Sequence, residues 1–174
     1  GDQDVVVAAP GDSGLTVFLA EDGGLRPAGT FTTSAERGAI ALADLDGRPG
    51  AELARVDVGE RRVSLLRFGL GGSPEPWQQV ELGAEGIGWG ELWTGDLDGD
   101  GDGDLALVHP QPGSAPPSGY ELITARGADG GTSWTVVRTP VARQNRYRLE
   151  VGDVNGDGLL DVVPVWLMSP ETTA

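Results

Sequence analysis

Short apolar segments, each separated from the next by glycine, proline or acidic residues, recur along the whole chain. They are five to seven residues long and rich in β-branched and aromatic residues, a composition that favours strands over helices. No stretch of the chain shows the periodicity of a convincing amphipathic helix. The pattern therefore predicts an all-β fold. The predicted strands are residues 5–9, 15–19, 28–32, 39–43, 53–58, 62–68, 77–82, 89–95, 105–109, 120–125, 134–139, 147–152 and 162–167.

The amino-acid composition agrees with a chain of many turns and narrows the choice of partners. Among 174 residues, 29 are glycine and 12 are proline. The formal net charge of −15 argues against nucleic acids and anionic membranes as partners, because both attract basic surfaces. No apolar run approaches the roughly 20 residues needed to cross a bilayer, so we expect no membrane insertion, and no signal peptide is visible.

Three acidic segments share one spacing, and each lies between two predicted strands. In residues 96–104, aspartate stands at positions one, three, five, seven and nine, and glycine fills three of the gaps. Residues 153–161 repeat the spacing with acid or amide at positions one, three and five. Residues 44–52 are a weaker copy, with Arg48 and Pro49 at positions five and six. Oxygen ligands at alternate positions, with glycine where the backbone turns sharply, are typical of Ca²⁺ loops.

The copies recur at a regular interval. Residues 1–4 match positions six to nine of a fourth copy, so the ninth positions fall at Asp4, Glu52, Asp104 and Asp161, which are separated by 48, 52 and 57 residues. Each loop joins the two strands of a hairpin, and two further strands follow before the next loop. A unit of four strands in about 50 residues is the size of a propeller blade.

Residues 95–105 and 152–162 resemble FG-GAP/VCBS repeats, which form calcium-binding blades of integrin-α-like β-propellers. The resemblance implies that the side chains at positions one, three, five and nine bind Ca²⁺, together with the backbone carbonyl at position seven. The implied ligands are Asp96, Asp98, Asp100, Asp102 and Asp104 in one loop, and Asp153, Asn155, Asp157, Leu159 and Asp161 in the other. Two calcium sites are therefore expected.

The third loop departs from the pattern of the resemblance. It keeps the acidic residues Asp44, Asp46 and Glu52, but Arg48 places a fixed cation where a ligand belongs. We expect a degraded metal loop here, with a salt bridge from Arg48 as the alternative to a metal ion.

Under this resemblance the chain is a single propeller region. About three blades are too few to close a ring alone, so further blades or another chain are expected to complete it. Residues 1–38 supply strands two to four of a first blade, residues 39–83 a second blade, residues 84–140 a third, and residues 141–174 the start of a further blade.

Other calcium motifs fit the loops less well. An EF-hand needs glutamate at position twelve and flanking helices, whereas these loops have Leu107 and Pro164 there, between predicted strands. A dockerin loop continues as a helix, and the nonapeptides of RTX β-helices follow one another in tandem. The Asp-rich segments recur only once in about 50 residues.

Four other features carry weaker signals. His109, the only histidine, is expected to have a structural role. Trp77 and Trp134 begin equivalent strands and are expected to pack between blades, with a sugar-stacking platform as the alternative. A basic stretch is either a solvated face or a contact for an acidic partner or an anionic glycan, and the Pro-rich segment 111–119 is a candidate binding loop. The basic stretch contains Arg138, Arg143, Arg146 and Arg148.

The favoured function is a non-catalytic, calcium-stabilised binding or scaffold module of a secreted or cell-surface protein, which engages a protein or a glycan, as in cell adhesion. All 12 basic residues are arginine, which indicates a GC-rich bacterial genome. Two alternatives remain open. One is an accessory propeller of a carbohydrate-active enzyme, such as a polysaccharide lyase. The other is a structural subunit of an extracellular assembly that associates through open blade edges.

Overall fold

The computed structural model describes residues 3–8, 14–21, 23–32, 37–69, 71–83, 90–110, 119–141 and 147–166. All regular structure in these residues is β, which confirms the predicted all-β class, and each predicted strand overlaps one of the thirteen observed strands. No helix in this part of the chain could cross a membrane. The strands are β1 (Val5–Ala8), β2 (Gly14–Glu21), β3 (Gly24–Thr32), β4 (Arg37–Ala43), β5 (Glu52–Asp57), β6 (Arg62–Phe68), β7 (Pro74–Glu81), β8 (Glu91–Gly95), β9 (Asp104–Pro110), β10 (Tyr120–Ala128), β11 (Ser133–Val141), β12 (Tyr147–Gly152) and β13 (Asp161–Trp166).

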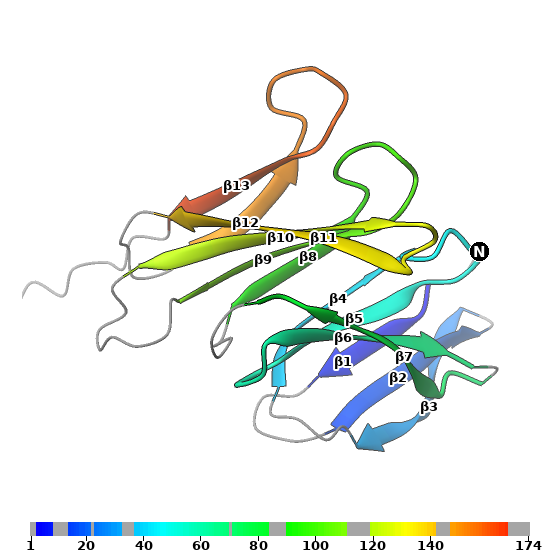
Figure 1. Cartoon of the computed structure of the whole chain (residues 1–174). Helices are drawn as coiled ribbons and strands as arrows, with labels where there is room; N and C mark the ends of the chain where they lie inside the picture. The colour runs from blue at the N-terminus through cyan, green and yellow to red at the C-terminus, as the bar shows by residue number, and fades with distance from the viewer. Residues whose placement is uncertain are drawn as a thin grey trace, which may run out of the picture.

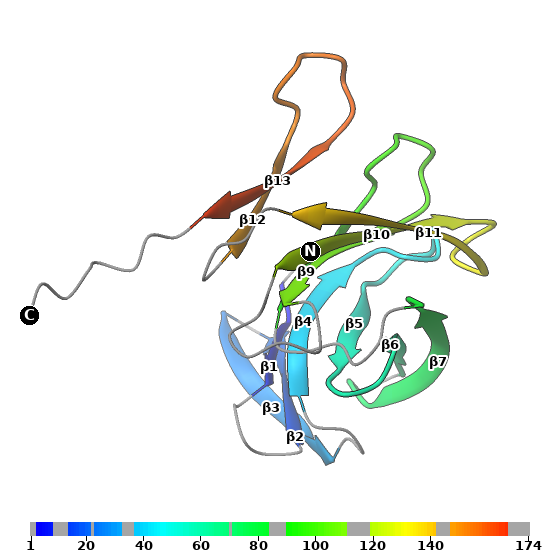
Figure 2. The same ribbon diagram turned by 60° about the vertical axis from the view of Figure 1, so that its left-hand side comes forward.

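The strands form four antiparallel sheets, and the predicted four-stranded units are confirmed in two of them. Sheet I has the order β1-β2-β3, sheet II β4-β5-β6-β7, sheet III β8-β9-β10-β11, and sheet IV consists of β12 and β13. Sheet I lies beside sheet II and sheet IV beside sheet III in both views (Figure 1, Figure 2). Within each sheet, every strand pairs with the next one in the chain, so the sheets are made of hairpins.

Two outer strands begin earlier than the sequence pattern predicts. β3 starts at Gly24 and β7 at Pro74, whereas the predicted strands begin at residues 28 and 77. Both strands contain proline, which an edge strand tolerates because its outer N–H groups need no partner in the sheet. The pairing of each with its inner neighbour shifts register once, at Val17/Phe18 and at Leu65/Leu66.

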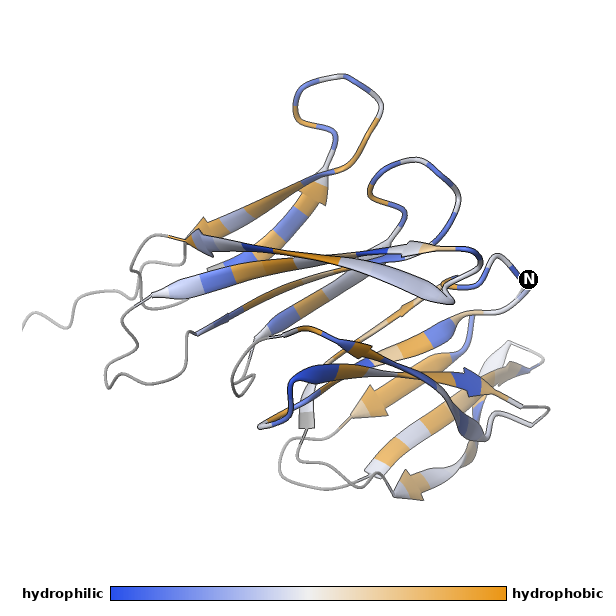
Figure 3. Ribbon diagram, viewed as in Figure 1, coloured by the Kyte–Doolittle hydropathy of each residue, from blue (hydrophilic) through white to orange (hydrophobic). Residues whose placement is uncertain are grey.

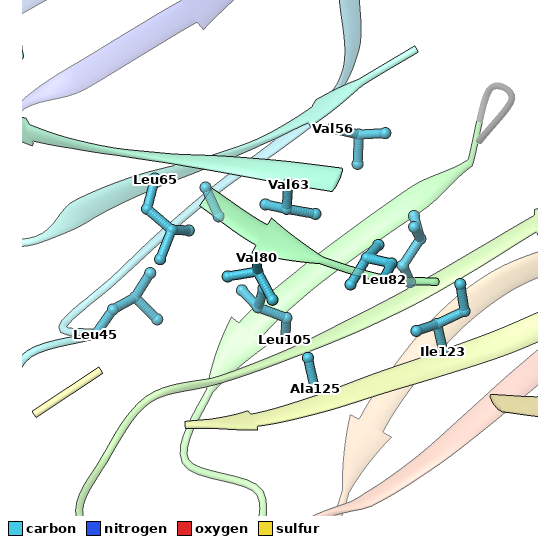
Figure 4. Packing of buried hydrophobic residues seen from close by; sticks show 11 residues of the cluster. Leu45, Val56, Val63, Leu65, Val80, Leu82, Leu105, Ile123 and Ala125 are labelled. Atoms are coloured by element: carbon cyan, nitrogen blue, oxygen red, sulfur yellow. The ribbon is translucent and has the colours of Figure 1, made fainter. Parts of the chain in front are cut away.

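The largest core lies between sheets II and III, and Figure 4 shows its side chains meeting from both sides. β5 is buried at all six positions because successive side chains point to opposite faces of sheet II, and each face is covered by another sheet. Leu53 contacts Leu15 and Leu66 in a second core between sheets I and II, whereas Ala54 belongs to the first. The first core consists of Leu45, Ala54, Val56, Val63, Leu65, Val80, Leu82, Leu105, Leu107, Ile123 and Ala125.

Two tryptophans of the described part of the chain add to the first core. Trp77 and Trp134 are partly buried against it, so the packing interpretation is confirmed for this pair. Trp89 lies outside the described residues. In Figure 3 hydrophobic residues are concentrated along the strands, whereas the hairpin loops are mainly hydrophilic or neutral with a few hydrophobic residues.

A buried ionic cluster lies at the end of β5. The Asp57 side chain is 1% exposed and accepts hydrogen bonds from Arg55 Nη2 at 2.7 Å, Arg62 Nε at 3.1 Å and Ser64 Oγ at 2.6 Å. A buried carboxylate is tolerated when charged and polar donors surround it in this way. The cluster is at the opposite end of β5 from the loop at residues 44–52 and belongs to the framework.

Candidate metal centres

Three hairpin loops at one end of the sheets carry the acidic motif. The Asp44 loop (residues 44–52) joins β4 to β5, the Asp96 loop (residues 96–104) joins β8 to β9, and the Asp153 loop (residues 153–161) joins β12 to β13. The second and third loops project side by side in Figure 1. The three loops are in contact in series. A Cβ on Gly103 would lie 2.6 Å from the Asp44 carbonyl oxygen, and a Cβ on Gly99 would lie 3.1 Å from Leu159 Cδ2.

The Asp96 loop brings three carboxylates together. One oxygen from each of Asp96, Asp98 and Asp104 lies within 4.8 Å of the others. Asp104 is fully buried, and its two oxygens accept the Leu97 N–H at 2.7 Å and the Gly127 N–H at 2.8 Å. Burial raises the pKa of the Asp104 carboxyl, while these two hydrogen bonds oppose the shift.

The position of Asp98 indicates that the group fits a cation. Asp98 Oδ1 is buried without a hydrogen-bond partner among the described residues, and its Oδ2 lies 3.5 Å from Arg126 Nη1. Asp96 is fixed by the N–H groups of Gly99 and Gly101, at 2.7 and 3.0 Å. Three converging carboxylates, one with an unsatisfied oxygen, suit a hard divalent ion that prefers oxygen ligands.

The remaining aspartates of this loop lie outside the converging group. Asp100 Oδ1 accepts the Asp102 N–H at 2.8 Å, and Asp102 Oδ1 accepts the Gly130 N–H at 3.2 Å. The Asp102 side chain is therefore engaged by the turn between β10 and β11. This arrangement is compatible with the implied ligand at position seven, which is a backbone carbonyl and not a side chain.

The Asp153 loop repeats the internal hydrogen bonds of the Asp96 loop. Its first carboxylate accepts the N–H groups of Gly156 and Gly158 at 2.6 and 2.9 Å, and Asp161 accepts the Val154 N–H at 3.0 Å. The hydrogen bonds from Gly158 and Gly156 lower the pKa of the exposed Asp153 carboxyl. The backbone is thus shaped as in the Asp96 loop.

The ligands implied for the Asp153 loop are less closely gathered. Among the described acidic residues, the groups that converge to within 4.8 Å lie in the other two loops. Asn155 accepts the Asp157 N–H at 2.8 Å and donates its own amide to Asp157 Oδ2 at 3.0 Å. Sheet IV has two strands in the described part, so Asp161 has no third-strand donor there equivalent to Gly127.

The Asp44 loop gathers its acids but also holds arginines. Oxygens of Asp44, Asp46 and Glu52 lie within 4.8 Å of one another, and burial raises the pKa of the Glu52 carboxyl. The expected salt bridge is present, with Arg48 Nε 3.8 Å from Asp46 Oδ2, although the Arg48 side chain is 75% exposed. A closer partner, Arg67 Nη2, contacts the same oxygen.

The loop sequence does not reveal Arg67, because this residue lies on β6, outside the loop. Leu66 of β6 pairs with Leu53, and Ala125 of β10 pairs with Leu105, so Arg67 occupies the register position of Arg126. The sequence does contain a signal for Arg67, because an arginine stands at the same register position on the third strand of sheets II and III.

The partial copy at the start of the chain makes one contact typical of the motif. Asp4 Oδ1 accepts the Ala20 N–H at 2.8 Å. Val5 pairs with Phe18, which places Ala20 at the register position that Gly127 occupies opposite Asp104. The ninth-position carboxylate thus binds the strand that follows its own strand in the same way in both sheets, β2 in sheet I and β10 in sheet III. Residues 1 and 2 lie outside the described part.

The weaker sequence signals have ordinary structural explanations where they are described. Arg138 Nη2 lies 2.6 Å from Glu121 Oε2, and Arg148 Nε lies 3.1 Å from Glu150 Oε1, so both arginines are paired within the chain. His109 is fully buried beside Glu121. Arg143, Arg146 and the segment 111–118 lie outside the described residues.

Comparison with known proteins adds no assignment: no family model matches the chain, and no curated protein matches it. The interpretation of the loops therefore rests on their spacing and geometry.

Proposed function

We propose that this chain is a calcium-stabilised binding or scaffold module, built from the blades of a β-propeller and working outside the cell. In this proposal sheet I is a partial blade, sheets II and III are complete blades, and sheet IV begins another. A protein or a glycan binds to its loops. Extracellular Ca²⁺ is millimolar, which suits exposed hairpin loops, whereas submicromolar cytosolic Ca²⁺ would leave weak sites empty.

The observation that carries the proposal is the convergence of Asp96, Asp98 and Asp104 in a loop whose spacing recurs at the same place in neighbouring sheets. The ligand set is all oxygen, as Ca²⁺ prefers, and the buried Asp98 oxygen lacks a protein donor among the described residues. If Ca²⁺ binds the folded state and not the unfolded chain, each occupied site would stabilise the folded state by about 2.7 kcal/mol when the free Ca²⁺ concentration is 100 times Kd.

A cleft between sheets I and II supplies one candidate ligand surface. It has a volume of about 830 Å³ and opens beside the Asp44 loop. Its lining combines apolar Val17 and Leu19 with charged Asp4, Glu52 and Arg67. Mixed apolar and charged walls suit a ligand with both kinds of surface, such as a peptide segment.

The proposal is tested by calcium titration and thermal unfolding. The wild-type chain is expected to bind two ions, one in the Asp96 loop and one in the Asp153 loop, and to unfold at a lower temperature in EGTA. Asp98→Ala and Asp157→Ala should each remove one ion, and the double variant should unfold at the same temperature with or without EGTA. Glu150→Ala, which changes an exposed acid outside the loops, serves as the matched control.

A wild-type chain that binds no calcium, or whose unfolding temperature ignores EGTA, would contradict the proposal. Cleavage of polyuronides by the intact chain would instead support the accessory-enzyme alternative.

Association between chains is a second candidate, favoured by the edges of sheets I and IV. In the described residues β1 and β13 are paired on one side only, and Val5, Val7, Val163 and Val165 are exposed.

The two edges differ, however. Leu149 faces Pro164, and the Leu149 N–H points away from β13 to Glu91 Oε2, so the nitrogen of Pro164 also points to the outer edge. A proline there removes one donor and disfavours pairing along β13, which leaves β1 as the better edge.

A further inference from the structure

Asp46 and Asp98 occupy the same loop position but have different partners. Both oxygens of Asp46 are engaged: Oδ1 accepts the Arg48 N–H at 2.9 Å, and Oδ2 contacts the Arg67 guanidinium. Asp98 Oδ1 has no partner among the described residues. The Asp46 side chain is also more deeply buried, with 3% exposed against 24% for Asp98.

Trp77 holds the Arg67 side chain beside the Asp44 loop. The guanidinium carbon of Arg67 stacks 3.9 Å from the centre of the Trp77 ring, and Trp77 is itself packed against the core between sheets II and III. The Arg67 side chain is 35% exposed, whereas Arg126, at the same register position in sheet III, is 58% exposed and lies 3.5 Å from Asp98. Stacking on an aromatic face fixes a planar guanidinium in one place.

The backbone of the Asp44 loop is also altered. In the other two loops the first carboxylate accepts an N–H from the glycine at position six, Gly101 or Gly158. Position six of the Asp44 loop is Pro49, which has no N–H, so Asp44 keeps the hydrogen bond from Gly47 and loses its second donor. The arginine side chains that contact Asp46 therefore contribute more to the shape of this loop than arginines do in the other two loops.

We propose that Arg67 is the resident cation of the Asp44 loop and determines that this loop takes no divalent ion. The proposal rests on the proposed function, in which Ca²⁺ binds the Asp96 and Asp153 loops. A guanidinium stays charged at all physiological pH values, so the carboxylates of Asp44, Asp46 and Glu52 are partly neutralised without metal. A divalent ion entering the group would face the charge of Arg67 and would have to displace it from Asp46.

The same arrangement gives Arg67 a structural role. It connects β6 to the loop between β4 and β5 and, through Trp77, to the core shared with sheet III. The Asp44 loop therefore keeps its shape at any calcium concentration, while the other two loops depend on the ion.

The test counts bound calcium ions in variants that distinguish two possible causes of metal exclusion. One is the presence of Arg67, and the other is the lack of an acidic ligand at position five. Arg48→Asp restores an acid at that position. The single variant should still bind two ions because Arg67 remains, whereas Arg48→Asp with Arg67→Met should bind three. Arg48→Asp with Arg67→Lys, which keeps a positive charge, is the control and should remain at two.

Three outcomes would overturn the inference while leaving the proposed function intact: three ions in the wild type, three ions in the single variant Arg48→Asp, or two ions in Arg48→Asp/Arg67→Met. The single variant removes no contact of Arg67, so the test holds even if Arg67→Met folds poorly. A wild type that binds no calcium would contradict the proposed function instead.

A second measurement needs no calcium at all. In EDTA, Asp46→Asn and Arg67→Met should each lower the unfolding temperature by several degrees, and the double variant should lose less than the sum of the two. Additive losses would show that the two side chains act independently, which would overturn the resident-cation role.

Discussion

Single charged residues that look misplaced in the sequence have specific partners in the structure. Glu91 is the first residue of β8, and its Oε2 accepts the Leu149 N–H of β12 at 2.7 Å. The carboxylate thus joins β8 of sheet III to β12 of sheet IV. The sequence pattern marks Glu91 as unusual, but its partner lies 58 residues away and depends on how the sheets pack.

His109 is the residue whose protonation should affect stability most clearly. It is fully buried on β9, and neither ring nitrogen has a hydrogen-bond partner in the described part of the chain. Glu121 Oε2 lies 3.5 Å from Nε2, and Arg138 from β11 binds the same carboxylate. Burial lowers the pKa of the imidazole, the nearby Arg138 charge adds to the shift, and Glu121 opposes it.

We therefore predict that the protein loses stability below about pH 6.5, the ordinary pKa of histidine. The unfolded chain binds a proton that the folded chain excludes, so the free energy of unfolding falls as the pH drops, by at most about 1.4 kcal/mol per pH unit for one proton. His109→Gln should flatten this dependence in urea unfolding measured from about pH 7.5 to 5.5. An unchanged slope would show that other groups cause it.

At the scale of elements, the hairpin loop is the unit that repeats. All three loops place a glycine with positive φ at position four: Gly47 at 70°, Gly99 at 77° and Gly156 at 80°. The fourth-position N–H then reaches the first carboxylate in each loop, at 2.8, 2.7 and 2.6 Å respectively. The Asp-Gly spacing therefore determines the local backbone, which is why the hairpins could be predicted.

Gly101 tests this local requirement in isolation. Its φ is 92°, and a Cβ added there would have no neighbour within 4 Å, so Gly101→Ala adds conformational strain without a clash. We predict a loss of roughly 1–2 kcal/mol in the free energy of unfolding and weaker calcium binding by the Asp96 loop. Gly152→Ala, also without neighbours but with φ outside the left-handed region, is the control and should be neutral or slightly stabilising. Equal effects in the two variants would contradict the prediction.

At the scale of the whole molecule, the loops and turns of sheets II and III are packed together. A Cβ on Gly131, in the turn between β10 and β11, would lie 2.4 Å from the Leu45 carbonyl oxygen. Gln78 of β7 donates a hydrogen bond to the Thr132 carbonyl oxygen at 3.3 Å. Arg138 of sheet III also donates to the Gly83 carbonyl oxygen, just after β7, at 2.8 Å. Sheets II and III are therefore joined by polar contacts as well as by the core.

Gly103→Ala is predicted to disturb this packing. The new Cβ would lie 2.6 Å from both the Asp44 carbonyl oxygen and Leu45 Cδ2, and backbone cannot yield as easily as a side chain. We expect a loss of about 1–3 kcal/mol in the free energy of unfolding, measured by chemical denaturation in chelator. Gly24→Ala, whose nearest neighbour would be 3.9 Å away, is the control. A loss no larger than that of the control would mean that the loops move apart at little cost.

The strands, the hairpins and the acidic loops could be predicted from the sequence, because they depend on residues close together in the chain. Alternating apolar residues mark a strand, and Asp-Gly spacing marks a turn whose N–H groups meet carboxylates three to five residues away. The partners of those loops, in contrast, depend on how the strands and sheets are arranged in space. Arg67 reaches Asp46 from 21 residues away, Gly127 reaches Asp104 from 23, and both contacts depend on the register of a third strand. The hydrophobic pattern of the strands and the geometry of the turns between them set that register, and neither can be read from the spacing within the loop.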